Sequence, residues 1–174
     1  MSTRARIGIQ QKNRIIASYQ HWDGYPGGLG YNLIDNWTDS SKVTKGIMLG
    51  DSSKWHYIIG DKVDFNDRDN PMHEVQNVYY GRDRGEKNAG YRIYKDEKEY
   101  LKNGFNSGEQ FVYLMKLDGR KNYMDKPIGT WYYAELTYTD SGKYVNGDFK
   151  LLEEIAIRDH INILKDSLKG RKVA

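Results

Sequence analysis

The chain has 174 residues, of which 38% are hydrophobic and 29% are charged, a balance typical of one water-soluble globular domain. It contains no cysteine, which excludes a disulfide framework, a thiolate nucleophile and any sulfur-ligated metal centre. The 27 lysines and arginines exceed the 24 aspartates and glutamates by only three, too small a surplus for a dedicated nucleic-acid binder.

The chain shows no sign of division or of membrane targeting. No linker, internal repeat or low-complexity stretch appears, so we expect one domain over residues 1–174. No apolar run is long enough to span a membrane, and the N-terminus lacks the apolar stretch of a secretory signal. The sequence therefore predicts a cytoplasmic protein without a membrane partner.

The first predicted elements are a hairpin and a short helix. Residues 4–10 and 14–22 alternate between polar and apolar side chains and are joined by a turn-prone segment. A short helix is predicted to begin near Gly27. Its buried face would consist of Leu29, Leu33, Ile34 and Trp37.

A second helix is predicted to begin at a serine cap, Ser40 or Ser41, and to end at Gly50. Its inward side chains would be Val43, Ile47 and Met48. A short strand is expected around residues 57–59. Residues 64–71 are polar and rich in turn formers, which predicts a surface loop.

Strands are again predicted downstream. Residues 74–81 and 90–94 have strand-like composition, and they flank a charged connection over residues 82–87. That connection is too polar to be buried without partners, so it is a candidate for function.

The next elements are a capped helix and a second strand pair. Asp96 followed by Glu99 is the pattern of a capping box, which predicts a helix of one or two turns. Residues 110–117 and 130–139 are rich in aromatic and β-branched side chains and are expected to pair antiparallel. The polar segment 118–129 is the predicted loop between them.

From Asp148 onward the pattern is that of one long amphipathic helix, with acidic residues early and lysines late, as the helix dipole favours. Its apolar stripe consists of Leu152, Ile155, Ile157, Ile161, Leu164 and Leu168. Together the elements predict an α+β fold, with an antiparallel or mixed sheet of about six strands covered by short helices and this long C-terminal helix.

The first candidate site lies where the hairpin ends. His21 and Asp23 are two residues apart on a strand and so project from one face, where an imidazole beside a carboxylate can act as a general base. The backbone amides around Gly28, with Tyr25 beside them, could receive a phosphate or carboxylate. A turn that needs glycine, a capping Asp23 and an ordinary surface histidine explain the same residues without a ligand.

The second candidate site is the charged connection. Tyr80, Arg82, Asp83, Arg84 and Glu86 combine two guanidinium groups, two carboxylates and an aromatic ring, which suits an anionic or nucleotide-like ligand. A solvated loop whose charges neutralise one another is the competing interpretation.

We expect no cofactor and no dedicated metal site. His56, His73 and His160 are scattered along the chain, and residues 64–71 place Arg68 where a calcium loop needs a ligand.

Two segments carry a resemblance to a known family. The HWDGYP segment at residues 21–26 and the GRDRGE segment at residues 81–86 together resemble a family of small uncharacterised proteins of bacteriophages and bacteria. The likeness covers about the first two-thirds of the chain. Family members often have cysteine at the position of Gln20 and an acidic or bulky residue at those of Gly27 and Gly28. The resemblance implies a phage origin and a shared site rather than a particular reaction.

Two functions are therefore carried forward. The first is a phage-encoded accessory protein that acts in the cytoplasm of the infected host cell by binding. Its partner would be a host protein, for takeover or counter-defence, or a small anionic, nucleotide-like ligand.

The alternative is a small hydrolase or transferase acting on a nucleotide-like substrate, with His21 as general base beside Asp23 and an arginine on the phosphate. It requires His21 to lie within hydrogen-bond reach of a carboxylate, in a cleft that also contains Arg82 or Arg84. A structural role in the virion is a third possibility.

Overall fold

The computed structural model describes residues 2–138, 140 and 144–172 of the chain. These residues form a nine-stranded sheet whose main path runs in the order β4-β3-β2-β1-β6-β7-β8, with β5 paired to β2 and β9 paired to β7. The strands are β1 (Ala5–Gln10), β2 (Ile15–Gln20), β3 (Ser52–Lys54), β4 (Val78–Tyr79), β5 (Arg92–Tyr94), β6 (Phe111–Lys121), β7 (Pro127–Tyr138), β8 (Tyr144–Asn146) and β9 (Lys150–Leu151). The helices are the π-helix η1 (Pro26–Gly30), α1 (Tyr31–Asn36), α2 (Ser40–Met48), the 3-10 helix η2 (Pro71–Glu74), α3 (Tyr80–Arg84), α4 (Glu97–Asn106) and α5 (Glu153–Lys172).

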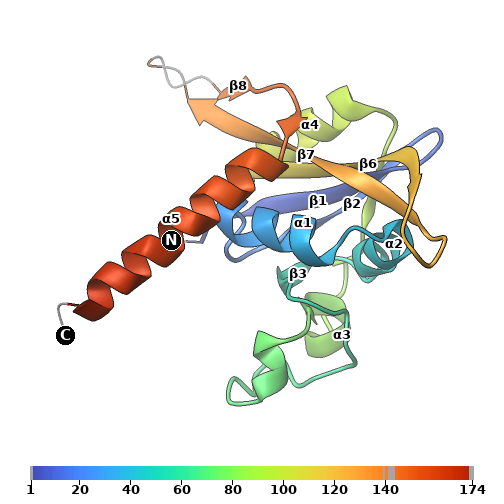
Figure 1. The fold of residues 1–174 in the computed structure, drawn as a ribbon. Helices are drawn as coiled ribbons and strands as arrows, with labels where there is room; N and C mark the ends of the chain where they lie inside the picture. The colour runs from blue at the N-terminus through green and yellow to red at the C-terminus, as the bar shows by residue number, and fades with distance from the viewer. Residues whose placement is uncertain (1, 139, 141–143, 173–174) are drawn as a thin grey trace.

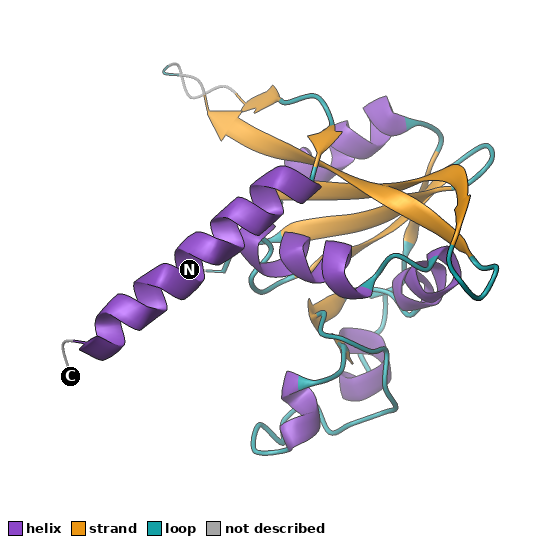
Figure 2. Cartoon of the chain, in the orientation of Figure 1, coloured by secondary structure: helices purple, strands orange, loops and turns teal. Residues whose placement is uncertain are grey.

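The sheet is mixed, because β1 pairs with β6 and β2 pairs with β3 in parallel while the other pairs run antiparallel. Figures 1 and 2 show short helices against the sheet and the long α5 extending away from it. The predicted α+β fold is confirmed. Several of the strands beyond the six expected, β3, β8 and β9, are two or three residues long, too short to show an alternating pattern.

The centre of the sheet is β1, which is buried on both faces and forms the predicted hairpin with β2. On one face Ile7 and Ile9 pack in the hydrophobic cluster that includes the buried residues of α1 and α2. On the other face the ring of Tyr100 in α4 lies so close to Gly8 that a β-carbon there would be 2.8 Å from it. The sheet is thus a middle layer with a helical layer on each side.

The two early helices follow the predicted pattern with two corrections. The helix expected near Gly27 begins as η1 and continues as α1, and it buries Leu29, Leu33 and Trp37 as expected. The cap of α2 is Asp39 rather than a serine, because the Asp39 carboxylate accepts hydrogen bonds from the backbone amides of the first turn. Met48 is 53% exposed rather than buried.

The strand expected around residues 57–59 is absent from the described structure, where Ile58 forms only an isolated bridge with Gln76. The strand is instead the polar segment β3, which pairs with β2 and β4. Only two residues of the segment 74–81 are in β4, and the chain then forms the helix α3. Pairing with strands far along the chain overrides local strand propensity here.

In the second half of the chain β5 is shorter than the strand predicted over residues 90–94, whereas α4 and the pair β6 and β7 are longer than predicted. The Asp96 carboxylate accepts from the Glu99 amide as expected, yet α4 runs for ten residues. The expected pair of strands is confirmed as β6 and β7, which extend through most of the segment 118–129 and leave a turn at residues 122–126.

The long C-terminal helix is confirmed, but its stripe does not cover the sheet. Because β9 pairs with β7, α5 begins at Glu153 rather than near residue 148. Leu152, just before the helix, is buried and Ile155 is half-buried. The remaining stripe residues are exposed: Ile157, Ile161, Leu164 and Leu168. None of the described helices combines the length and apolar character needed to cross a bilayer.

We predict that Asp39→Ala lowers the free energy of unfolding by about 1 kcal/mol, because two backbone amides of α2 lose their acceptor. Ser41→Ala is the matched control and should change it by less than about 0.5 kcal/mol. Urea denaturation measures both values. A larger loss in the Ser41 variant would assign the cap to the serine instead.

Candidate functional site

The short strand β3 brings the two predicted segments together. On one side, the backbone amide of Trp22 donates to the carbonyl of Ser53 at 3.1 Å. On the other side β3 pairs with β4, and the amide of Tyr80 donates to the carbonyl of Asp51 at 3.1 Å. Segments about sixty residues apart in sequence are thus neighbours across one strand.

A cleft of about 320 Å³ opens beside this strand, between the end of β2 and the lobe. We define the lobe as residues 56–87, which contain η2, β4 and α3 and project from the sheet edge (Figure 1). We call the cavity the Trp22 cleft. Its lining residues are Trp22, Asp23, Ser53, Lys54, Arg68, His73, Glu74 and Val78.

The charges of the Trp22 cleft are unequally paired. Lys54 Nζ lies 3.3 Å from Asp23 Oδ2, with both side chains partly exposed. The Arg68 guanidinium lies over the ring of Phe65, 5.2 Å from its centroid, and among the described residues no carboxylate is within ion-pair distance of it. The Trp22 side chain is 44% exposed. Within the described residues the cleft therefore presents an unpaired cation, Arg68, and an unpaired carboxylate, Glu74, beside an accessible aromatic ring.

Two histidines of the lobe that are 17 residues apart in the sequence lie next to each other, and one of them, His73, lines the cleft. His73 is buried, and its Nε2 lies 2.9 Å from the carbonyl of Asp64, which accepts a hydrogen bond from it. The ring of His56 bonds the backbone of His73, and its Nε2 is buried without a partner. Burial lowers the pKa of His56, and the charge of Lys54 lowers it further. No spacing in the sequence reveals this pair, because irregular backbone connects the two residues.

The lowered pKa of His56 predicts a pH dependence of stability. A histidine ring ordinarily has a pKa of 6.5, and burial holds the His56 ring neutral in the fold, so the unfolded chain binds the proton more readily. The free energy of unfolding should fall as the pH drops below about 6.5, and this fall should be smaller in His56→Gln. Urea denaturation at pH 7 and pH 5 measures it. An identical pH dependence in both proteins would contradict the assignment.

His21 lies outside the Trp22 cleft. Its Nδ1 is 2.7 Å from the hydroxyl of Tyr19, which is its one ring hydrogen bond among the described residues. Burial lowers the pKa of His21, as does the charge of Arg4. The arrangement required for His21 as a general base, a carboxylate partner in a cleft with an arginine, is not what the described residues show.

Asp23 is primarily a turn residue. Its backbone is left-handed, with φ of 57°, and its carbonyl accepts from the Leu29 amide at 2.9 Å, which starts η1. The amide of Gly28 donates to the Tyr25 carbonyl at 3.0 Å. A β-carbon on Gly28 would be 2.8 Å from the Tyr25 ring. Packing thus accounts for the glycine, and these amides are already bonded within the turn.

Arg82 and Asp83 are the internal support of the lobe. Arg82 Nε pairs with Asp83 Oδ1 at 2.9 Å, and the Asp83 side chain is fully buried. The guanidinium donates to backbone carbonyls at 2.8–3.1 Å, those of Ile59, Gly60 and Asn77. The Asp83 carboxylate accepts from the backbone amides of Val63 and Tyr79. Both side chains therefore make their hydrogen bonds within the protein and are not free to bind a ligand.

We predict that Arg82→Ala destabilises the protein by about 3 kcal/mol, because it leaves the buried Asp83 carboxylate and the carbonyls of the lobe without their partner. Arg84→Ala, which removes an exposed pair, should cost less than about 1 kcal/mol.

Urea denaturation gives the two values, and hydrogen exchange should show faster exchange of lobe amides in Arg82→Ala. Unchanged lobe exchange would contradict the proposed support.

A more exposed group within the lobe consists of Tyr80, Arg84 and Glu86. Arg84 pairs with Glu86, and both side chains are 44% exposed. Its guanidinium lies 4.6 Å from the ring centroids of Tyr80 and Phe65. Burial raises the pKa of Tyr80, and a hydrogen bond with the Ser53 side chain offsets part of this rise. Arg84 and Arg68 thus contact the same Phe65 ring, which links this group to the Trp22 cleft.

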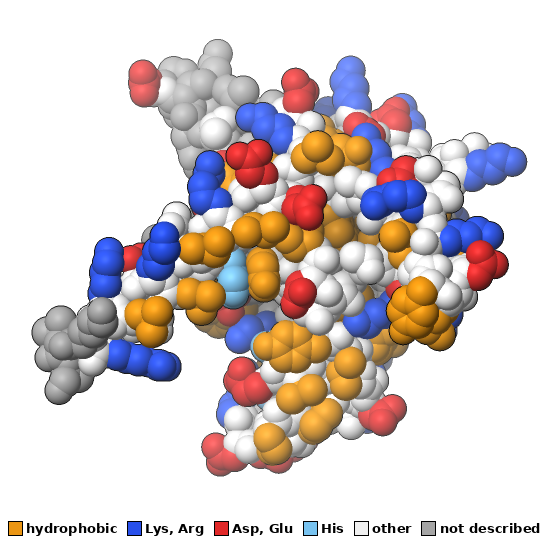
Figure 3. Space-filling model, in the orientation of Figure 1, with side chains coloured by type: hydrophobic (Ala, Val, Ile, Leu, Met, Phe, Trp, Pro, Cys, Tyr) orange, Lys and Arg blue, Asp and Glu red, His pale blue; other side chains and the backbone are white. Residues whose placement is uncertain are grey.

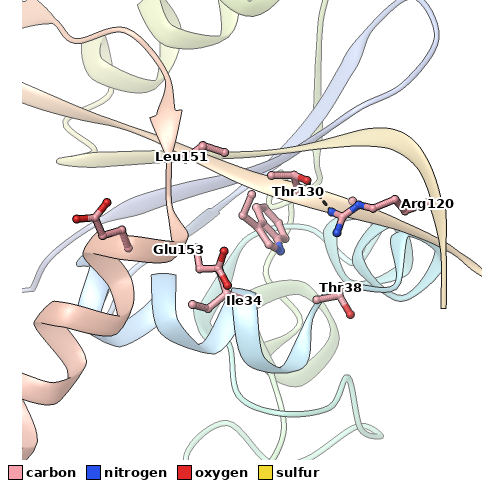
Figure 4. A pocket seen from close by; sticks show the side chains of 9 residues that line it. Ile34, Thr38, Arg120, Thr130, Leu151 and Glu153 are labelled. Atoms are coloured by element: carbon pink, nitrogen blue, oxygen red, sulfur yellow. Dashed lines mark hydrogen bonds between the residues drawn. The ribbon is translucent and has the colours of Figure 1, made fainter. Parts of the chain in front are cut away.

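A larger cavity, of about 550 Å³, lies elsewhere in the molecule, between α1, β7 and the start of α5 (Figure 4). Its arginine, Arg120, is bound to Asp118 and Thr130. Glu153 and Glu154 also line it and have no ion pair among the described residues. This balance does not suit an anion, and the cavity contains no residue predicted for a site.

Comparison of the chain with protein-family models, with curated proteins and with solved structures finds no match. The resemblance of the HWDGYP and GRDRGE segments stays a prediction.

Proposed function

We propose that this protein is a binding protein that holds a small anionic, nucleotide-like ligand in the Trp22 cleft. In keeping with the resemblance, it would act as a phage-encoded accessory protein in the cytoplasm of the infected host cell. The observation that carries the binding proposal is the Arg68 guanidinium, which is free of any carboxylate within the described structure and lines the same cleft as the exposed Trp22 ring.

The cleft has the parts that such a ligand needs. A guanidinium binds phosphate oxygens through two parallel hydrogen bonds. The Arg68 guanidinium lies over the Phe65 ring, which restricts its position in the cleft. Lys54 can add a second cation, because an exposed pair such as Lys54–Asp23 is worth only about 0–1 kcal/mol and exchanges readily. The indole of Trp22 offers a stacking surface for a base. A volume of about 320 Å³ falls in the range of small-ligand sites.

Binding has more support than catalysis at this site. The alternative, a small enzyme with His21 as general base, needs that ring in the cleft with a carboxylate partner. The His21 ring instead bonds the hydroxyl of Tyr19 and does not line the cavity.

A thermal-shift experiment with mononucleotides tests the proposal. A ligand at 100 times its Kd stabilises the folded state by about 2.7 kcal/mol, so a binding nucleotide should raise Tm by several degrees. Arg68→Ala should remove this shift. Arg14→Ala is the matched control, since Arg14 is exposed at the other end of β2, and it should keep the shift.

Two further ligands identify what the cleft recognises. Inorganic phosphate alone should give a small shift, and a nucleoside without phosphate should give less than the nucleotide if Arg68 supplies the main contact. Quenching of tryptophan fluorescence that Trp22→Phe abolishes would place the base at the indole. No shift with any mononucleotide, or an equal shift in Arg68→Ala, would refute the proposal.

A further inference from the structure

The exposed stripe of α5 is a feature that the proposed function leaves unused. Four aliphatic side chains follow one another along the helix: Ile157, Ile161, Leu164 and Leu168. Their exposed fractions are 39%, 44%, 51% and 57%, so each keeps a large part of its apolar area in water. Exposed apolar side chains that are contiguous, rather than scattered, mark interaction surfaces.

The packing of α5 on the body does not use this stripe. The contact is made by the face that carries Ala156, which is buried, and His160, which stacks on Tyr31 with ring centroids 3.7 Å apart. His160 Nδ1 also lies 3.1 Å from the carbonyl of Gly27. At about 100° per residue, the stripe is turned roughly a quarter of the circumference away from that face.

The stripe has the spacing of a coiled-coil seam. Its residues are separated by four, three and four positions, the a and d pattern of a heptad repeat. The seam itself is narrow, and the 42% exposed Ile163 lies off it, on the side of His160 and next to Gly27. A helix that lies in a membrane interface presents a broad apolar face instead. The geometry therefore favours a helical partner that inserts its own side chains between those of α5.

The charges beside the stripe are mainly basic. Helical geometry places Lys165 and Lys169 along one edge of it and Arg171 along the other, while the carboxylates of Asp159 and Asp166 fall on the opposite side of the helix. Lys169 has a long contact of 4.0 Å with Asp166. Lys165 and Arg171 have no carboxylate within ion-pair distance in the described ranges.

Figure 3 shows hydrophobic side chains along α5 with lysine and arginine side chains bordering them toward its free end. A second copy of the same helix would bring equal basic edges together, which costs pairing energy in coiled coils. A partner with acidic edges would instead pair with them.

We infer that the exposed stripe of α5 is a docking surface for an amphipathic helix with acidic flanks from another protein. The apolar seam supplies burial and the basic edges select the partner by charge. This surface is independent of the Trp22 cleft, so it stands whether or not the cleft binds a nucleotide.

A pair of designed peptides tests this inference on the full chain. The probe is a 21-residue helical peptide with leucine at heptad positions a and d and glutamate at the flanking positions e and g. Its counterpart has lysine at e and g. In fluorescence anisotropy the acidic peptide should bind with micromolar Kd, and the basic peptide at least tenfold more weakly.

Variants of α5 keep the test specific. Ile161→Ser combined with Leu164→Ser should abolish binding of the acidic peptide without lowering Tm, because both side chains are already exposed. Asp166→Asn, on the opposite side of the helix, is the matched control and should retain binding.

Several outcomes would overturn the inference. Equal affinity for the two peptides, no binding at 100 μM, or binding that survives the double substitution would each do so. A dimer in sedimentation equilibrium that the double substitution dissociates would assign the stripe to a second copy of the chain. Co-sedimentation with phosphatidylglycerol vesicles that the double substitution abolishes would assign it to a lipid surface.

Discussion

The ion pair between Arg82 and Asp83 is the constraint on which the proposed site depends. The lobe has little regular structure, so its backbone groups must find partners among side chains. Arg82 takes three of its carbonyls and Asp83 takes two of its amides. These bonds hold together both ends of the lobe, and with them the loop that carries Arg68 and His73 against β3.

Whether a charged side chain has partners within the protein separates groups that support the fold from groups that are free to bind a ligand. Of the two arginines in the GRDRGE segment, Arg82 is committed to the lobe, whereas Arg84 is half exposed with Glu86. Arg68, which in the sequence only breaks a calcium-loop pattern, has no acidic partner in the described part of the chain. A charged residue is therefore informative for function only when its partners are known. That criterion moves the proposed site from His21 to the Trp22 cleft.

Much of the architecture follows from local patterns in the sequence. The hairpin of β1 and β2, the pair β6 and β7 and the long α5 each repeat a two-residue or 3.6-residue period over enough positions to be recognised. The cap of α4 is recognised as a local motif. The lobe could not be predicted in this way. Its strand β4 is two residues long and pairs with the three-residue β3, and the form of the lobe depends on contacts with residues far along the chain.

The sequence by itself determined the class of fold, the order of its main elements and the two segments that meet at β3. The tertiary structure alone decided which side chains in those segments bond within the protein, which histidines lie together and which face of α5 stays uncovered. The physical reason is the sequence separation over which each kind of interaction acts. Periodicity and capping act over a few residues and can be read locally, whereas burial and ion pairing depend on contacts between residues far apart in the chain. Such contacts form only when the whole chain has folded.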